Sequence, residues 1–288
     1  MKSRLRIAVL GVPLAIIAAL AIGSWWAAGQ WLRPSPRAIG APPPDLEART
    51  VEFSGAEGHR LRGWLAPGRG AGGVVLVHGV RESRRAMLGR ARFLHQAGYA
   101  VLLFDLSAHG ESDGEQTGFG AAEAADVDAA VAVLRAAVPG EKIAAIGFSL
   151  GAAACVLGTA PLPVDALVLE APYADIESAI DNRLRLRFGA AGPWLAPLLT
   201  AQLWARRHIP MHELRPVDAI RRAHVPVLVI AGSVDPRATP ADVKRVFAAA
   251  NEPKELWIVP GAGHTDFHRA APQEYERRVL AFLANAFS

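Results

Sequence analysis

The stretch Gly-Phe-Ser-Leu-Gly at residues 147–151 decides how the rest of the chain is interpreted. A short apolar run at 142–146 precedes it, and an alanine-rich segment at 152–157 follows it as an expected helix. A Gly-x-Ser-x-Gly sequence between a strand and a helix is typical of a nucleophile elbow, a tight turn that exposes the serine hydroxyl. Because a serine alone is a poor nucleophile, Ser149 requires a histidine base and a carboxylate further along the chain.

The segments around this stretch alternate between expected strands and helices. A glycine-containing turn joins two short strands, and the apolar run at 74–77 has the composition of a strand buried on both faces. We expect strands at 50–53, 61–65, 74–77, 100–104, 143–146, 166–169, 227–230 and 255–259, and helices at 84–97, 121–138, 150–159, 240–250 and 272–286. This alternation predicts an α/β fold, a mostly parallel central sheet with helices on both faces.

One interval breaks the alternation. The segment between the expected strands at 166–169 and 227–230 is too long for a plain connection, so we expect a helical lid insertion at about 172–220. An ordinary crossover helix with long loops is the alternative. The interval holds more arginine than acidic residues, which favours neutral or anionic acyl substrates.

The amino terminus is basic and then apolar. Residues 7–28 contain no ionisable side chain and follow Lys2, Arg4 and Arg6. This pattern predicts a single-pass membrane anchor at 1–32, with the folded domain on the extracytoplasmic side. A signal peptide cleaved near residues 27–29, which would leave a secreted or periplasmic protein, is the alternative.

The remaining organisation is simple. A proline-rich stretch at 33–47 predicts a stiff, extended linker, and residues 48–288 form one domain. The net charge is +4, but the arginines are spread along the chain, so we expect no nucleic-acid partner. Cys155 is the single cysteine and is expected to be a small buried hydrophobe. Without metal-ligand spacing or a phosphate loop, the sequence predicts no metal and no cofactor, and it leaves the oligomeric state open.

Ligands of open α/β sheets bind at the carboxyl ends of the strands, so residues that follow strands are candidate site residues. The oxyanion formed in acyl transfer needs two backbone N–H donors, and the residue after the nucleophile, Leu150, supplies one of them. We predict Val80, after the strand at 74–77, as the second donor. Arg81 is the alternative donor, and His78 is expected to brace the loop.

Asp235 and His264 follow the strands at 227–230 and 255–259. A carboxylate at position 235 can orient an imidazole, and His264 lies in a glycine-containing loop from which its ring can reach the serine. The order Ser149, Asp235, His264 is that of nucleophile, acid and base in hydrolases with this elbow.

Other titratable residues have alternative or simpler interpretations. Glu170 and Asp175 are weaker candidates for the acid, and His268 competes with His264 for the role of base. Asp105 and His109 are expected to tie a turn together. Three carboxylates are assigned to the surface at a helix start, where they favour the helix dipole: Glu123, Asp126 and Asp128.

Together these motifs resemble the α/β-hydrolase superfamily, specifically bacterial serine hydrolases of the serine aminopeptidase-like or dienelactone-hydrolase-like type. The matching motifs lie at 76–79, 105, 109–112, 147–151, 169–173, 232, 235 and 263–264. The resemblance implies a serine hydrolase that cleaves a carboxylic ester, thioester or amide of a small acyl substrate through a Ser-His-Asp triad and an acyl-enzyme. The sequence departs from the family at Ser107-Ala108, where Arg-Gly is common. A membrane-tethered peptidase and a non-catalytic binding domain are the alternatives.

Overall fold

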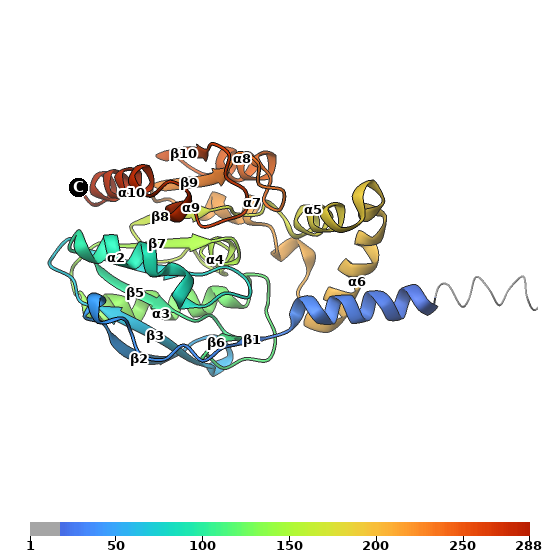
Figure 1. Cartoon of the computed structure of the whole chain (residues 1–288), viewed down its shortest axis with the longest axis horizontal. Helices are drawn as coiled ribbons and strands as arrows, with labels where there is room; N and C mark the ends of the chain where they lie inside the picture. The colour runs from blue at the N-terminus through green and yellow to red at the C-terminus, as the bar shows by residue number, and fades with distance from the viewer. Residues whose placement is uncertain (1–17) are drawn as a thin grey trace, which may run out of the picture.

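An eight-stranded sheet forms the centre of the folded chain (Figure 1). The computed structural model describes residues 18–288, with the side chains of residues 203 and 207 left aside. The strands are β2 (Arg49–Ser54), β3 (Arg60–Ala66), β4 (Gly73–Val77), β5 (Ala100–Phe104), β7 (Ile143–Phe148), β8 (Ala166–Glu170), β9 (Val227–Gly232) and β10 (Lys254–Val259). Their order is β10-β9-β8-β7-β4-β5-β3-β2, and every neighbouring pair is parallel except the two that include β3. The predicted α/β fold with a mostly parallel sheet is confirmed.

The inner strands are buried on both faces, as their aliphatic sequences predict. Every residue of β4, β5 and β8 is buried. Val77 pairs in register with Gly147, and Phe148 pairs with Glu170, so β4, β7 and β8 end close together at one edge of the sheet. The residues that follow these strands therefore meet at that edge.

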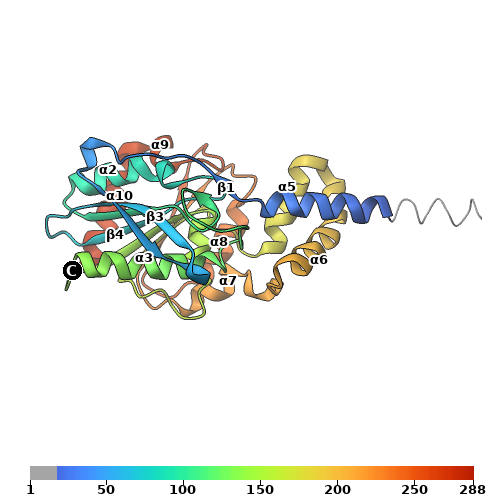
Figure 2. The ribbon, with the colours of Figure 1, turned by 90° about the horizontal axis from the view of Figure 1, so that it is seen from below.

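Helices cover both faces of the sheet. On one face lie α2 (Leu88–Gln96), α9 (Phe267–Ala270) and α10 (Pro272–Phe287), and on the other lie α3 (Glu123–Ala137) and α4 (Leu150–Ala154). Figure 2 shows α2 and α9 on one side of the strands and α3 on the other. The ring of Phe93 on α2 lies 5.9 Å from that of Tyr275 on α10, which fixes these two helices on the same face.

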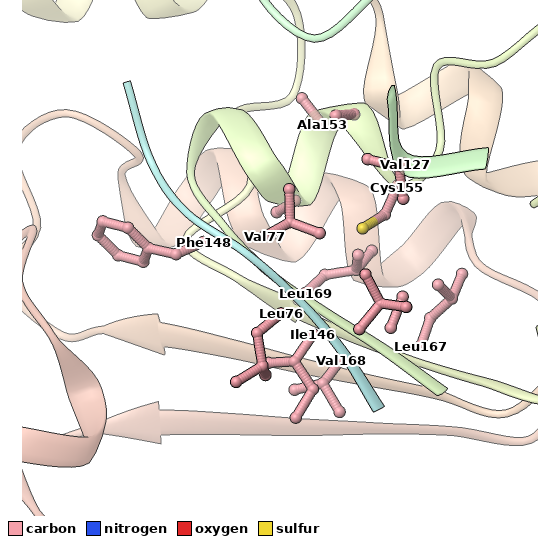
Figure 3. Close-up of a cluster of buried hydrophobic side chains, with 14 of the residues drawn as sticks. Leu76, Val77, Val127, Ile146, Phe148, Ala153, Cys155, Leu167, Val168 and Leu169 are labelled. Atoms are coloured by element: carbon pink, nitrogen blue, oxygen red, sulfur yellow. The ribbon is translucent and has the colours of Figure 1, made fainter. Parts of the chain in front are cut away.

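The core between β4, β7, β8 and helix α4 is a continuous layer of aliphatic side chains (Figure 3). Val77 of β4 and Leu169 of β8 are completely buried in it, whereas Leu76, Ile146 and Val168 are buried on the opposite face of the sheet. Cys155 lies in the same layer, and burial raises the pKa of its thiol to about 12. Its behaviour as a small buried hydrophobe agrees with the prediction.

Two predicted helices differ in detail from the structure. The segment expected as a helix from 84 begins as a 3-10 turn, η3 (Arg84–Met87), before α2 starts. The helix expected to reach residue 159 ends at Ala154, where the amide of Val156 already bonds the carbonyl three residues before it. Gly158 and Pro161 follow closely, and neither residue type supports a helix interior.

The long interval between β8 and β9 is helical. It contains α5 (Ile176–Phe188), η4 (Gly189–Leu195), α6 (Ala196–Arg207), η5 (Met211–Glu213), α7 (Pro216–Ala219) and η6 (Ile220–Arg222), and α8 (Pro240–Ala249) follows β9. The side chain of Asp175 caps α5 by accepting a hydrogen bond of 2.7 Å from the Ser178 amide. A Cβ at Gly192 would lie 2.4 Å from the Leu184 backbone, so glycine is what lets η4 pack back onto α5.

A helix over residues 18–32 lies beside α6, away from the sheet (Figures 1 and 2). The Arg206 guanidinium stacks 3.6 Å from the Trp25 ring and also donates to the Trp25 carbonyl at 2.8 Å. We call residues 18–32 and 176–207 the helical end of the molecule, and the rest the sheet body. Over residues 18–288 no helix has both the length and the apolar character needed to cross a membrane. The first part of the predicted anchor lies outside the described residues.

The predicted linker at 33–47 lies on the sheet body and contains a 3-10 turn, η1 (Pro44–Leu46), near its end. Its strand β1 (Ser35–Pro36) pairs in parallel with β6 (His109–Gly110). The Glu111 carboxylate accepts hydrogen bonds from the amides of Ile39 and Gly40 at 2.9 and 3.1 Å. Ile39 is buried, so this stretch is attached to the body along its length.

Candidate active site

The turn between β7 and α4 holds Ser149 in an unusual backbone conformation, with φ 52° and ψ −106°. Non-glycine residues rarely adopt such angles, which cost about 1–3 kcal/mol and persist only where the surroundings impose them. A Cβ at Gly147 would lie 2.4 Å from the Gly151 carbonyl oxygen, and one at Gly151 would lie 2.4 Å from the Val77 carbonyl oxygen. The two glycines therefore permit the close crossing of strand and helix that raises Ser149 at the sheet edge.

A chain of hydrogen bonds links Asp235, His264 and Ser149. His264 Nε2 lies 3.1 Å from Ser149 Oγ, and His264 Nδ1 lies 2.7 Å from Asp235 Oδ2. The other carboxylate oxygen of Asp235 accepts hydrogen bonds from the amides of Arg237 and Ala238 at 2.8 and 3.0 Å. With Nδ1–H donating to Asp235, the Nε2 lone pair faces the serine hydroxyl, which is the arrangement a general base needs.

The loops that carry Asp235 and His264 are joined to each other. The Val234 amide donates to the Ala262 carbonyl at 3.0 Å, and Ser233 Oγ accepts a hydrogen bond of 2.8 Å from the Gly261 amide. A Cβ at Gly232 would lie only 2.3 Å from the Ala262 carbonyl oxygen. The histidine loop is therefore fixed against the aspartate loop, whereas its glycines alone suggested mobility.

The predicted oxyanion donors Val80 and Leu150 line the same cavity as Ser149. Neither backbone amide donates a hydrogen bond to another group of residues 18–288. Glu82 shapes the Val80 loop because its carboxylate accepts a hydrogen bond of 3.0 Å from the Gly79 amide. Two unused N–H groups beside a serine can accommodate a developing negative charge.

His78 braces this loop, as predicted. Its Nδ1 donates to the Gly79 carbonyl at 2.7 Å, and its Nε2 accepts from the Leu106 amide at 3.1 Å. Complete burial, followed by the nearby His109, lowers the pKa of His78 to about 3. The ring is neutral at physiological pH and has both nitrogens occupied, so it has no free position from which to act as a base.

The alternative acids and base have other partners. Glu170 is completely buried and accepts hydrogen bonds from Arg90 Nε at 2.8 Å and from the Tyr275 hydroxyl at 2.5 Å. Asp175 caps α5 and pairs with Arg245 at 2.7 Å. His268 bonds Glu276 at 2.8 Å and stacks on Phe93. Glu170 and Asp175 do not bond His264, and His268 does not bond Ser149.

Two of the three acidic residues assigned to the helix surface, Glu123 and Asp126, are instead buried, so that interpretation is wrong for them. Asp126 accepts hydrogen bonds from the Ser107 amide and hydroxyl at 2.8 and 3.0 Å and from the Ala56 amide at 2.8 Å. Glu123 accepts hydrogen bonds of 2.7 Å from Thr117 and from two glycine amides of the 117–120 loop. Asp126 binds backbone amides that are distant in the sequence, and Glu123 binds the loop that directly precedes its own helix. Helical periodicity does not reveal either contact.

Asp105 ties two segments together, although not through His109. It pairs with Arg84, whose own amide donates to it at 2.7 Å, and it accepts a further bond of 2.9 Å from the Glu111 amide. Arg84 is completely buried and also pairs with the Glu111 carboxylate. His109 instead bonds the Ser107 carbonyl at 2.8 Å.

A cavity of about 620 Å³ opens beside Ser149. Its walls come from the sheet body, from α5 and from the helix over 18–32, and the residues that line it are Trp31, Val80, Arg81, Phe119, Ser149, Leu150, Tyr173, Ile176, Ala179, Ile180, Arg183, Leu186, Arg187 and Arg237. Sequence reasoning did not place Trp31, Arg183 or Arg237 at the site. The excess of arginine in the 172–220 interval was the one signal that pointed towards Arg183, and no signal pointed towards Trp31 or Arg237.

No group of three or more His, Cys, Asp or Glu side chains within residues 18–288 is arranged to hold a metal ion.

The site has the arrangement of hydrolases built on an open α/β sheet. In that class a strained serine lies at a strand–helix turn, and a histidine and a carboxylate come from later strand ends. Residues 74–278 match the model of the family described as "Alpha/beta hydrolase family". The chain belongs to the α/β-hydrolase family and is an enzyme of that family.

Relatives and solved structures agree with this assignment. The chain is 35% identical over 238 residues to an uncharacterised protein of Mycobacterium tuberculosis, covering 81% of this chain and 76% of that protein. It is 24% identical to the uncharacterised protein YqkD of Bacillus subtilis, covering 83% of this chain and 80% of that one. The esterase Pf2001 of Pyrococcus furiosus superimposes with a TM-score of 0.73 at 26% identity, covering 89% of this chain and 99% of that structure. The α/β-hydrolase GrgF from Penicillium matches with a TM-score of 0.64 at 25% identity, covering 83% and 99%.

Proposed function

We propose that this enzyme cleaves a carboxylic ester, or a related thioester or amide, through an acyl-enzyme formed on Ser149. The observation that carries the proposal is the hydrogen-bonded chain from Asp235 through His264 to Ser149 at the wall of an open cavity. The structural likeness to the Pyrococcus furiosus esterase supports the choice of ester.

The reaction follows from these positions. His264 Nε2 takes the proton of the Ser149 hydroxyl, and Oγ attacks the substrate carbonyl carbon to form a tetrahedral oxyanion. The amides of Val80 and Leu150 donate to that oxyanion. His264 then protonates the departing alcohol, which leaves the acyl group on Ser149. A water molecule repeats the sequence on the acyl-enzyme and releases the carboxylic acid. Asp235 remains ionised throughout and stabilises the imidazolium.

A fluorophosphonate probe tests the nucleophile directly. The wild-type protein should become labelled and should hydrolyse a short p-nitrophenyl ester, whereas Ser149→Ala should do neither. Ser54→Ala, an exposed serine at the end of β2, is the matched control and should retain both properties. A folded wild-type protein that takes no label and cleaves no ester would refute the proposal and favour a non-catalytic binding domain.

Peptidase activity is the second candidate within the same chemistry. An aminopeptidase needs a carboxylate to bind the ammonium group of its substrate. The cavity lining among the described residues contains four arginines and neither Asp nor Glu, which favours esters over amino-terminal peptides. Parallel assays with a p-nitrophenyl ester and an aminoacyl p-nitroanilide distinguish the two, and faster anilide cleavage would reverse this preference.

We also propose that α5, η4 and α6 act as a lid over the cavity. Ile176, Ile180 and Arg183 of α5 line the cavity, which supports this role.

We further propose that the helical end lies at a membrane. Among the described side chains of residues 18–288, nine of the ten exposed large apolar ones belong to the helical end, and Trp194 is the most exposed of them at 85%. The basic, apolar amino terminus favours an anchor with the domain on the extracytoplasmic side.

Two experiments test this location. The full chain should float with lipid vesicles in a density gradient, and it should be digested when protease is added to spheroplasts. A protein that stays at the bottom of the gradient would refute the membrane proposal, and protection from protease would refute the extracytoplasmic side.

A further inference from the structure

The cavity beside Ser149 is lined by positive charges that lack carboxylate partners among residues 18–288. Four arginines line it: Arg81, Arg183, Arg187 and Arg237. None of the four forms an ion pair with a carboxylate of residues 18–288. We propose that the substrate carries an oxyanion group, a carboxylate or a phosphate, which Arg183 and Arg237 bind while the ester carbonyl lies at Ser149. This inference rests on the proposed ester hydrolysis.

Arg183 is the central residue of this site. It projects from the middle of α5, is partly buried, and has one protein partner among the described residues, the Ala179 carbonyl 3.1 Å from its Nη1. Burial lowers the pKa of Arg183, and the neighbouring charges of Arg237 and Arg81 lower it further. The guanidinium nevertheless remains protonated at physiological pH, because an arginine does not lose its proton in a protein. A partly desolvated charge beside like charges is unfavourable until an anion joins it.

Buried arginines elsewhere in the molecule are compensated. Arg84 pairs with Asp105 and Glu111, and Arg90 pairs with Glu170. The sheet body thus supplies a carboxylate wherever it buries a guanidinium. The absence of such a partner around Arg183, within the described part of the chain, indicates that the missing anion comes from the ligand.

Two acids near the wall arginines in the chain, Asp235 beside Arg237 and Glu177 on the helix of Arg183, already have other partners. Asp235 accepts hydrogen bonds from His264 and from two backbone amides. Glu177 lies one turn or more before Arg183 on α5, does not line the cavity, and is within 4.0 Å of Arg215. The Tyr173 hydroxyl, which does line the cavity, donates to the Phe119 carbonyl at 2.6 Å. No described wall residue is left to neutralise the guanidiniums.

The remaining walls define the rest of the ligand. Val80, Leu150, Ile176, Ile180 and Leu186 give the cavity apolar surface beside the arginines. A volume of about 620 Å³ is that of a small-molecule site. The geometry therefore suits an ester with a short hydrocarbon part between its carbonyl and its anionic group.

Matched substrates test the charge preference. Mono-4-nitrophenyl glutarate carries a free carboxylate, and its methyl ester is the neutral match with the same leaving group. We expect the wild-type enzyme to show a kcat/KM for the anionic ester about 10- to 100-fold above that for the neutral ester, the range expected for one charge-assisted hydrogen bond. Raising the salt concentration should reduce this ratio, because Arg183 is partly exposed to solvent and Arg81, Arg187 and Arg237 are exposed.

Variants locate the site. Arg183→Gln and Arg237→Gln should each lower the anionic-to-neutral ratio by about 10-fold or more. Arg185→Gln is the matched control, because Arg185 lies on the same helix, is exposed and does not line the cavity. It should leave the ratio unchanged. The ratio is insensitive to the fraction of folded protein, so an unstable variant still gives an answer.

A second pair of substrates separates the two oxyanions. Monobutyryl glycerol 3-phosphate and monobutyrin differ by the phosphate, and release of butyrate is measured for both. A preference for the phosphate ester alone would assign a phosphate on the alcohol side, and a preference for the glutarate alone would assign a carboxylate on the acyl side. Wild-type ratios of one or below in both pairs, or ratios that Arg183→Gln and Arg237→Gln leave unchanged, would overturn the inference. Loss of fluorophosphonate labelling and of all ester cleavage would instead refute the proposed function.

Discussion

The sheet body and the helical end differ in how they treat the same residue types. In the sheet body, large apolar side chains are buried or partly buried except for Val234, and the buried arginines are paired with carboxylates. In the helical end, tryptophans, leucines and a phenylalanine are exposed, and Arg183 and Arg187 have no ion pair among residues 18–288. The sheet body therefore buries its apolar side chains and pairs its buried charges within the protein. The helical end leaves apolar side chains and arginine charges available to a ligand or another surface.

The comparison separates the proposed catalytic residues from residues that shape the cavity. Ser149, Asp235 and His264 all follow strands of the sheet body. The helical end contributes walls of the cavity, such as Trp31 and Arg183, but none of the hydrogen-bonded chain. Changes in the body should therefore alter turnover or stability, and changes in the helical end should alter what binds.

The largest effect is expected at the proposed base. His264→Ala should reduce kcat by at least ~10⁴-fold, because no other group can take the Ser149 proton. Stopped-flow or steady-state hydrolysis of a p-nitrophenyl ester measures this loss. His268→Ala is the control and should cost little, since its ring bonds Glu276 and does not reach Ser149. Equal losses in the two variants would place the base outside the chain of Asp235 and His264.

The next effect concerns the buried charges of the body. Glu170→Gln should lower the free energy of unfolding by about 3–5 kcal/mol, because it leaves the buried Arg90 without its principal counter-charge. Urea denaturation measures the change. Glu274→Gln removes an exposed pair with Arg277 and should have a much smaller effect. If both variants unfolded at the same urea concentration, burial of an ion pair would not decide how much it stabilises the sheet body.

A smaller effect is expected at Asp126. Asp126→Asn should lower the free energy of unfolding by about 1–3 kcal/mol at neutral pH, because an amide cannot accept all the hydrogen bonds from Ser107 and Ala56. Burial raises the pKa of Asp126 to about 6, above the roughly 3.9 of an unfolded aspartate. The folded state therefore binds this proton more tightly, and its contribution to stability is complete below about pH 4 and lost as the pH rises through about 6. Urea midpoints between pH 4 and 7 should show this slope in the wild type and lack it in Asp126→Asn.

The smallest effect on stability is expected at the helical end. Trp194→Ser should change the free energy of unfolding by no more than about 0.5 kcal/mol, because most of the side chain is already exposed. The same change should weaken flotation of the full chain with lipid vesicles. Tyr99→Ser, a buried position of the sheet body, is the contrasting variant and should destabilise the protein without a specific effect on flotation. Undiminished flotation of Trp194→Ser would remove this tryptophan from the proposed membrane contact.

Much of the sheet body could be predicted from the sequence because its signals are local. Continuous aliphatic runs indicate buried parallel strands, and the elbow glycines at 147 and 151 are required by a crossing of adjacent elements. The positions of Ser149, Asp235 and His264 follow from the rule that strand ends meet at one edge. The structure joins these three residues in one chain of hydrogen bonds, with His264 between Asp235 and Ser149.

The rest depends on contacts between distant segments. Asp126 bonds Ala56, seventy residues away in the chain, so its burial could not be inferred from a helical pattern. Arg183 and Arg237 face one cavity because α5 packs over the strand ends, a placement that no spacing in the sequence encodes. The same is true of Trp31, which precedes the folded domain in the sequence yet lines its cavity.

The pairing of β1 with β6 attaches the end of the helix over residues 18–32 to the sheet body. Amide bonds from Ser35 and Arg37 to the body, the Arg81 bond to the Gln30 carbonyl and the buried Leu32 hold the end of that helix at the cavity. Trimming the chain at the prolines would remove Trp31 and open one side of the cavity. A membrane anchor attached to the sheet body in this way would fix the orientation of the cavity mouth relative to the bilayer. The hydrogen bonds of the sheet body would then decide from which side substrates approach.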